Sequence, residues 1–376
     1  MAWQGIFGVE EVALRFARAA RRERLGGSFL FVGPNGIGKR AFAFALAKTL
    51  LCRRNFPENA RANLGDPEDG ASDSELLERF RPCEKCDCCG QFQWSADNPE
   101  VSIPTNPDFH HVRKPDDKSL LPLELLIGDG KSRSGLRDFL GETSYSGGRK
   151  IAVVDDADFF NVEGANALLK TLEEPPPNSL IILIGTSEAK QLPTIRSRCQ
   201  IFRFKPLSTE ALAEVLIRQG AVEDPDEARR VASLSRGSLE IARQVLDPAL
   251  AEFQSALIAE LSRERLRAVA FAPKTLEFID GAGKEASAKR RRLQSALKGA
   301  LDFYRATLVA RESERSGGSG SGFGRAIAPV SAETALACVE RTLTALEQVD
   351  RNANLPYIVE SWLYDLAEAT RRGISR

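Results

Sequence analysis

The sequence has no long apolar run and no excess of charge of either sign. None of its apolar stretches approaches the roughly 18 residues that a membrane-spanning helix needs. Its start, MAWQGIFGVEEV, lacks the basic residues and apolar core of a signal peptide. Lys and Arg together number 52, and Asp and Glu also number 52, so the formal net charge is zero. We therefore expect a soluble cytoplasmic protein without a membrane partner, and we exclude one that binds nucleic acid through bulk positive charge alone.

Apolar strands alternate with helical patterns along the first part of the chain. Four runs predict buried strands: SFLFVG at 28–33, KIAVVDDAD at 150–158, SLIILIGTS at 179–187 and QIFRF at 200–204. Helical patterns lie before and between them, at 9–24, 41–52 and 161–175. This alternation predicts a mostly parallel α/β sheet. Residues 91–118, rich in Pro, Asn and Asp, are expected to be irregular.

The length of 376 residues suggests two or three domains. We expect an α/β domain at 1–206, in which the polar segment 53–82 is a flexible insert. Short helices broken by Gly and Pro predict a small helical domain at 207–248. Longer amphipathic helices predict an all-α domain at 249–376, interrupted by a Gly/Ser loop at 313–324.

The segment GPNGIGKR, residues 33–40, has the spacing of a phosphate-binding loop. Gly33, Gly36, Gly38 and Lys39 fit the pattern G-x-x-x-x-G-K between an apolar strand and a helix. Glycines allow backbone N–H groups to converge on phosphate, and Lys39 would reach the outer phosphates. The next residue should be Ser or Thr to bind magnesium, but Arg40 stands there and its guanidinium cannot coordinate a cation.

Two acids end the second predicted strand. In P-loop ATPases one acid at this place holds magnesium and the next polarises the attacking water. Asp155 and Asp156 occupy these places, although Asp156 is shorter than the usual Glu. The alternative is that acids here cap the following helix, which is our interpretation of Asp158.

Seven cysteines are present, and four of them crowd into CEKCDCC at 83–89. In a large intracellular protein this spacing favours a metal site over disulfides. A set of reduced, unliganded cysteines is the alternative. We expect His110 and His111, which lie nearby in the sequence, to be surface or loop residues.

The segment NALLKTLEEPPPNSLIILIGTSEAKQLPTIRSRCQIF, residues 166–202, resembles the clamp-loader subunits of bacterial DNA polymerase III, the group of gamma/tau and delta-prime. The resemblance implies an AAA+ P-loop ATPase-type domain, a small helical lid domain and a C-terminal all-α collar domain that assembles with neighbouring subunits. It implies a nucleotide site at Gly33, Asn35, Gly36, Gly38, Lys39, Arg40, Asp155, Asp156 and Thr186.

The same resemblance assigns roles to an arginine and to the cysteines. Ser197, Arg198 and Cys199 match the family's SRC motif, so Arg198 is expected to reach a neighbour's nucleotide in trans; an ordinary surface ion pair is the alternative. A structural zinc is expected within a module at 52–90, on Cys52, Cys83, Cys86 and Cys89, with Cys88 as a possible replacement.

Two residues distinguish the members of this family. Arg40 replaces the magnesium-binding hydroxyl, and Glu240 in GSLEIAR stands where active gamma/tau-like subunits have a nucleotide-sensing arginine. Both favour a delta-prime-like subunit that binds ATP or ADP at most, hydrolyses little and carries no polymerase activity. Its implied partners are delta and gamma/tau in a hetero-pentamer, the sliding β clamp and primed DNA. The alternatives are an active gamma/tau-type ATPase and a zinc-bearing DNA-binding adaptor.

Overall fold

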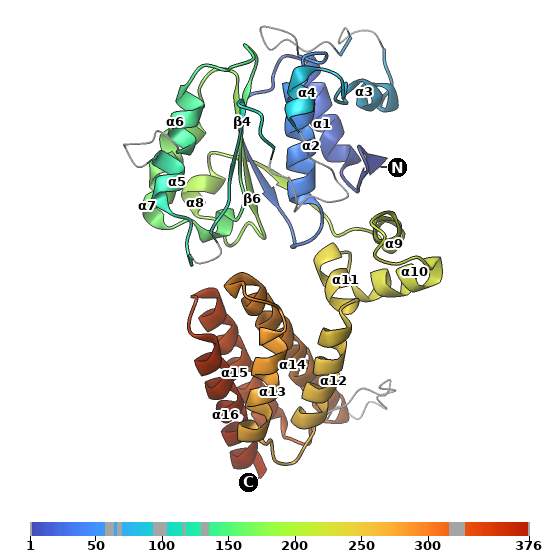
Figure 1. The fold of residues 1–376 in the computed structure, drawn as a ribbon, viewed down its shortest axis with the longest axis vertical. Coiled ribbons are helices and arrows are strands. Elements are labelled where there is room, and N and C mark those ends of the chain that lie inside the picture. Colours follow the sequence, from blue (N-terminus) through green and yellow to red (C-terminus); the bar gives the residue numbers. More distant parts are fainter. Residues whose placement is uncertain are drawn as a thin grey trace. The chain divides into compact units, whose positions relative to one another are not determined.

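The computed structural model describes residues 2–56, 64–65, 70–92, 104–115, 118–128, 135–315 and 328–374. The chain divides into two compact units (Figure 1). The first comprises residues 1–115 and 120–242, and the second comprises residues 116–119 and 243–376. Of the predicted Gly/Ser loop at 313–324, residues 316–324 lie outside the described part of the chain.

A five-stranded sheet forms the centre of the first unit. Its strands are β3 (Gly27–Val32), β4 (Phe109–Val112), β5 (Lys150–Val154), β6 (Ser179–Gly185) and β7 (Gln200–Arg203). Their order is β4-β5-β6-β3-β7, and every neighbouring pair is parallel. The central strands are apolar throughout because both faces of a parallel sheet are covered.

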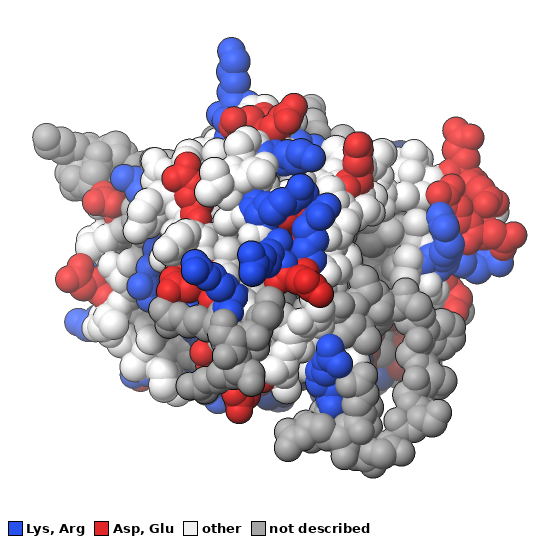
Figure 2. Space-filling model, turned by 90° about the horizontal axis from the view of Figure 1, so that it is seen from below, with Lys and Arg blue, Asp and Glu red and all other residues white. Residues whose placement is uncertain are grey.

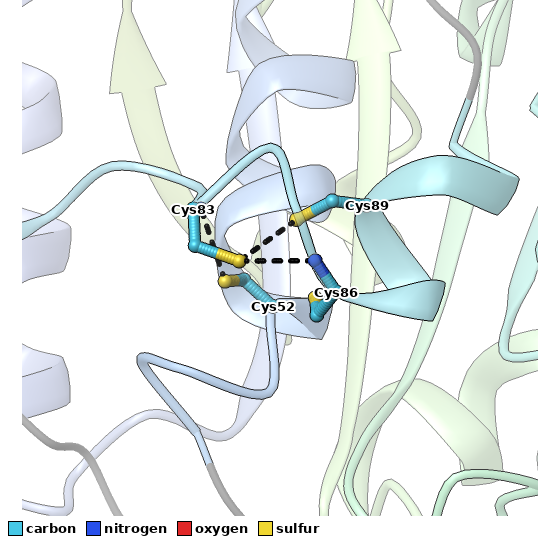
Figure 3. Close-up of side chains that lie close together, drawn as sticks. All are labelled: Cys52, Cys83, Cys86 and Cys89. Atoms are coloured by element: carbon cyan, nitrogen blue, oxygen red, sulfur yellow. Dashed lines mark hydrogen bonds between the residues drawn. The ribbon is translucent and has the colours of Figure 1, made fainter.

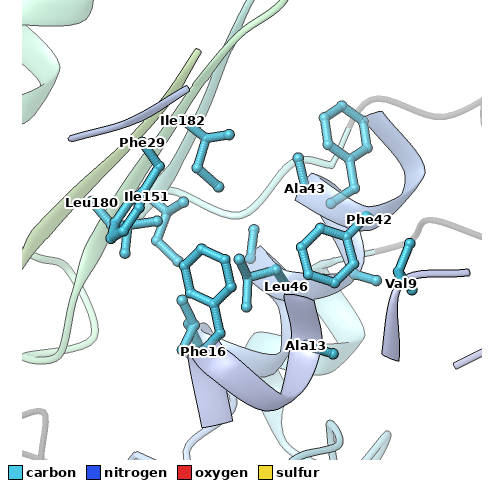
Figure 4. Packing of buried hydrophobic residues seen from close by; sticks show 14 of the residues in the cluster. Val9, Ala13, Phe16, Phe29, Phe42, Ala43, Leu46, Ile151, Leu180 and Ile182 are labelled. Carbon is cyan, nitrogen blue, oxygen red and sulfur yellow. The ribbon is translucent and has the colours of Figure 1, made fainter. Parts of the chain in front are cut away.

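Helices cover the two faces of this sheet. On one face, α1 (Glu10–Arg21) and α2 (Lys39–Leu51) pack against alternate strand residues through Phe16, Phe42 and Leu46 (Figure 4). On the other face the remaining strand residues contact α5 (Leu123–Ile127), α6 (Leu136–Gly141), α7 (Val162–Glu173) and α8 (Pro193–Arg196). The expected α/β fold with a helix-flanked parallel sheet is confirmed.

Strand β4 corrects one expectation from the sequence. It lies within residues 91–118, which we predicted to be irregular, and its sequence is Phe-His-His-Val. His110 and His111 are therefore strand residues, partly buried, rather than loop residues. Burial lowers the pKa of His111 to about 4 and also lowers that of His110. The strand was missed because it is short and half of it is polar.

The predicted insert contains regular structure. Helix α3 (Asp73–Arg79) begins at a capping box in which Ser72 and Glu75 satisfy each other's backbone N–H groups. Arg18 of α1 binds Asp73 at 2.7 Å, so α3 is attached to α1. Helix α4 (Asp87–Gln91) follows, and the short strands β1 (Ala2–Trp3) and β2 (Ile6–Phe7) form a hairpin before α1.

Short helices complete the first unit. They are α9 (Thr209–Arg218) and α10 (Pro225–Leu234), which pack on each other, and the start of α11 (Leu239–Val245). Ser208 caps α9 and Asp224 caps α10, as expected for side chains that accept from the first helical N–H groups. A separate lid domain at 207–248 remains a prediction.

The second unit is helical in its described part. It contains α12 (Pro248–Leu261), α13 (Ala268–Asp280), α14 (Ala286–Arg315), α15 (Ala332–Asp350) and α16 (Leu355–Ile374). Its core includes the fully buried side chains of Tyr304, Leu363 and Trp362.

None of the described helices is long and apolar enough to cross a bilayer. Figure 2 shows Asp and Glu beside Lys and Arg on the face it presents.

Candidate functional site

The loop between β3 and α2 has the backbone of an anion-binding nest. Gly36 and Gly38 have φ of 72° and 93°, a region that favours glycine. The backbone N–H groups of Gly36, Ile37, Gly38 and Lys39 follow one another in this loop. They stand at the N-terminus of the thirteen-residue helix α2, whose dipole favours an anion. The loop can therefore accept a phosphate group.

Lys39 lies folded back on the loop that would hold the phosphates. Its Nζ donates to the carbonyl oxygens of Gly33 and Pro34, each at 2.6 Å. Burial lowers the pKa of Lys39 to about 8, against an opposing effect of the negative charge on Asp155, Asp158 and Glu240. Phosphate would offer this ammonium a stronger partner than two neutral carbonyls.

Arg40 faces the acid that would hold magnesium. Its Nη1 lies 3.5 Å from Oδ2 of Asp155, and the two side chains are only 24% and 15% exposed. The cation beside Asp155 is thus supplied by the chain. A divalent cation at the same carboxylate would have to displace this guanidinium or bind beside it. Repulsion between the two positive charges disfavours binding of the ion.

Asp156 and Asp158 have different surroundings from Asp155. Asp156 has a left-handed backbone with φ of 60°, and burial raises its pKa to about 6. Asp158 accepts hydrogen bonds from the backbone N–H of Thr186 at 2.9 Å, from the Thr186 hydroxyl at 2.5 Å and from the Gln191 amide. Helix α7 is capped by Asn161. The interpretation of Asp158 as the cap of that helix is therefore wrong.

The start of α11 lies against the phosphate-binding loop. The Ser238 hydroxyl donates to the carbonyl of Asn35 at 2.8 Å, and the Leu239 N–H donates to that of Gly36 at 2.8 Å. A Cβ added at Gly36 would lie 2.6 Å from the backbone nitrogen of Glu240. This glycine is therefore required by close approach as well as by its φ. The sequence alone did not single out Ser238, because its only signal is its place between Gly237 and Glu240 in the segment GSLEIAR.

Arg198 lies two residues after the short helix α8 and binds within its own chain. Its Nε donates to Glu173 of α7 at 3.0 Å, and its Nη1 contacts the Thr194 carbonyl at 3.3 Å. The Arg198 side chain is 30% exposed and that of Glu173 is 60% exposed. Cys199 of the same motif is buried, which raises the pKa of its thiol to about 12. Arg198 is thus held near the surface, whereas Cys199 belongs to the core.

Four cysteines from two distant segments meet beside α2 and α4 (Figure 3). The sulfur atoms of Cys52, Cys83, Cys86 and Cys89 all lie within 4.8 Å of one another. The Cys83 N–H donates to the Cys52 sulfur at 3.2 Å, and the Cys86 N–H donates to the Cys83 sulfur at 3.3 Å. A tetrahedral zinc with Zn–S bonds of about 2.3 Å requires sulfur separations of about 3.8 Å. The four thiols fit such an ion.

Cys88 is not a member of this group of sulfurs. It is buried next to the cluster on α4, and burial raises the pKa of its thiol. Within the described residues, the site that could hold a metal therefore uses the four cysteines that the family resemblance implied.

Comparisons with known proteins fit this arrangement. A family model described as "DNA polymerase III, delta subunit" matches residues 71–208. The delta' subunit of Bacillus subtilis DNA polymerase III is 27% identical over 63% of this chain and 59% of its own length. That of Pseudomonas aeruginosa is 28% identical over 65% and 63%. The Escherichia coli tau subunit is 28% identical over 65% of this chain and 32% of its own.

A gamma subunit-related protein of Thermotoga maritima is a structural neighbour, with 17% identity and a TM-score of 0.38 over 96% of this chain and all of that one. The sequence alignments with the two delta' subunits span about three fifths of the length of those relatives. Over about two thirds of its own length, this chain is similar in sequence to delta-prime and tau subunits of bacterial DNA polymerase III.

Proposed function

We propose that this chain is a delta-prime-type subunit of a bacterial DNA polymerase III clamp loader. In this role it helps to load the sliding β clamp onto primed DNA, donates Arg198 to a neighbouring ATPase subunit and hydrolyses little ATP itself. Its partners are delta and gamma/tau subunits in a hetero-pentamer in the bacterial cytoplasm. Residues 207–248 serve as the lid and residues 249–376 as the collar that contacts neighbouring subunits.

The observation that carries the proposal is the pair of Arg40 and Asp155. In a magnesium-dependent P-loop ATPase a hydroxyl and this carboxylate hold the ion together. Here the hydroxyl is absent and the carboxylate lies 3.5 Å from a guanidinium. Glu240, beside Gly36, would add a negative charge next to a triphosphate. Each feature works against Mg-ATP hydrolysis at this site.

The proposed role of Arg198 follows from its accessibility. Its ion pair with Glu173 is partly exposed, and such pairs contribute at most about 1 kcal/mol to stability. A phosphate of a neighbour's nucleotide could therefore replace Glu173 at little cost. A guanidinium placed at the γ-phosphate in trans neutralises the charge that develops during phosphoryl transfer.

We also propose a structural zinc on Cys52, Cys83, Cys86 and Cys89. Four thiolates complete a tetrahedral shell and leave no position for a reacting water, so the ion would hold the segments after α2 and before α4 together. The zinc would supply no chemistry to the nucleotide site.

The second candidate function is an active gamma/tau-type ATPase. The observation in its favour is the nest at Gly36–Lys39, with glycines at the two positions of positive φ and the N-terminus of α2 behind it. This nest is compatible with ATP or ADP that stays bound without turnover, so it distinguishes the two functions less sharply than the pair of Arg40 and Asp155.

The test is reconstitution of a clamp loader from purified gamma/tau and delta, with and without this chain. We expect a complex that contains all three proteins, and loading of the β clamp onto primed DNA that depends on this chain. Failure of the chain to join the complex, or equal loading without it, would refute the proposed function.

A further inference from the structure

A basic pocket lies between α1 and the sheet, at the end of the strands opposite the phosphate-binding loop. Its volume is about 320 Å³. Gly26, which lines it, precedes β3, whereas the phosphate-binding loop follows that strand. Phe16, Phe29 and Phe202 form an apolar floor that belongs to the core of the unit. The pocket is therefore separate from the candidate nucleotide site.

The ionisable residues that line this pocket are all arginines: Arg15, Arg18, Arg22 and Arg24. Arg15 lies over the ring of Phe202, 4.4 Å from its centroid, and Arg18 binds Asp73. Arg22 and Arg24 are exposed, and their side chains have no partner among the residues that the structure describes. With Arg18 paired to Asp73, the guanidinium groups of Arg15, Arg22 and Arg24 make this site positive, and no carboxylate lines the pocket.

We propose that this pocket binds an acidic, extended segment of a partner protein. Guanidinium groups bind carboxylates through paired hydrogen bonds, so the exposed Arg22 and Arg24 suit the acids of such a segment. Gln200 and Phe202 of the lining belong to β7, the edge strand, which pairs only with β3 in the described sheet.

Two features favour a peptide over nucleic acid. An edge strand offers backbone N–H and C=O groups that a peptide backbone can pair with, as in recognition by strand addition. A single strand of nucleic acid instead follows a longer positive groove with aromatic rings exposed for base stacking. Here the rings of Phe16 and Phe202 are buried, at 2% and 3% exposure.

The experiment measures binding of fluorescein-labelled probes to the full chain by fluorescence anisotropy. The first probe is a peptide in which aspartate alternates with leucine, and its control has asparagine in place of aspartate. The second probe is a labelled oligo-deoxythymidine. Each is titrated with the wild-type chain, with the double variant Arg22→Gln/Arg24→Gln and with the matched control Arg229→Gln/Arg230→Gln on α10. Circular dichroism checks that both variants are folded.

We expect the aspartate peptide to bind and the asparagine peptide to bind much more weakly. The Arg22→Gln/Arg24→Gln variant should lose at least about tenfold in affinity, because a charged hydrogen bond contributes about 1.5 kcal/mol or more. The control variant should bind like the wild type. Two results would overturn the proposal: no binding of the aspartate peptide, or tighter binding of oligo-deoxythymidine that the same double variant abolishes. The outcome does not depend on assembly into a clamp loader.

Discussion

Replacement of Arg198 by alanine separates a catalytic role from a structural one. The structure predicts a small effect on folding, because Arg198 forms an ion pair with Glu173 in which the two side chains are 30% and 60% exposed. Such a pair contributes at most about 1 kcal/mol to the free energy of unfolding. A trans-acting arginine contributes about a thousandfold or more to the rate at the site it completes.

The assay is steady-state ATP hydrolysis by the reconstituted complex in the presence of the β clamp and primed DNA. With Arg198→Ala we expect the complex to lose the part of its ATP turnover that comes from the one site this chain completes. Single-turnover measurements should show that this site is nearly inactive. The thermal midpoint of the isolated chain should stay close to that of the wild type.

Two control variants sharpen the result. Arg196→Ala removes an exposed arginine two residues before Arg198, at the end of α8, and should leave turnover unchanged. Glu173→Gln removes the negative charge from the intrachain partner of Arg198 and should preserve or raise turnover. Unchanged ATP hydrolysis in a complex that contains Arg198→Ala would refute the reasoning, as would an equal loss with Arg196→Ala.

Three further predictions concern the metal site, the phosphate-binding loop and the effect of pH. Cys83→Ser should abolish zinc binding, measured by elemental analysis, and lower the free energy of unfolding by at least about 2 kcal/mol. The control variant Cys88→Ser should keep the zinc. A wild-type chain that contains no zinc would contradict this prediction. Arg40→Thr restores a hydroxyl and removes the guanidinium from Asp155. In the variant, magnesium should therefore tighten ATP binding about tenfold, as measured by calorimetry. An ATP affinity of the variant that does not change with magnesium would contradict this prediction. Burial lowers the pKa of His111 from 6.5 to about 4, so the stability contributed by its neutral form is complete above pH 6.5 and is lost as the pH falls towards 4. In urea unfolding the wild type should therefore lose more stability than His111→Phe over this range, by about 3 kcal/mol, and parallel pH profiles would oppose the assignment.

The strands with continuous apolar sequence could be predicted from the sequence, and β4 could not. Runs such as Phe29–Val32 and Leu180–Ile184 are buried on both faces of the sheet, and this burial requires the apolar residues that made them recognisable. In β4 the polar pair His110 and His111 interrupts the pattern, because an edge strand of the sheet is covered less completely.

Some residues of the candidate site could likewise be predicted from the sequence, and others could not. Local spacing was enough to select Gly36, Gly38 and Lys39, since the loop and the helix after it are contiguous. Spacing also indicated a metal site in CEKCDCC, but the inclusion of Cys52 followed from the family resemblance, because Cys52 and Cys83 meet only through the fold.

Contacts between distant segments could not be derived from spacing. The pair of Arg40 and Asp155 joins residues that stand far apart in the chain, and it depends on the parallel packing of β5 near the start of α2. The contact of Ser238 with Asn35 likewise depends on how α11 returns to the loop. The sequence therefore indicated which groups were present, and the fold determined which partners they have.

The most direct test of the central claim is ATP hydrolysis by the isolated chain and by its mixture with gamma/tau and delta. The claim is that this chain completes a neighbour's site without acting as an ATPase itself. We predict no magnesium-dependent hydrolysis by the isolated chain, and a rate in the mixture that exceeds that of gamma/tau and delta alone. Rapid hydrolysis by the isolated chain, lost in Lys39→Ala, would contradict the account.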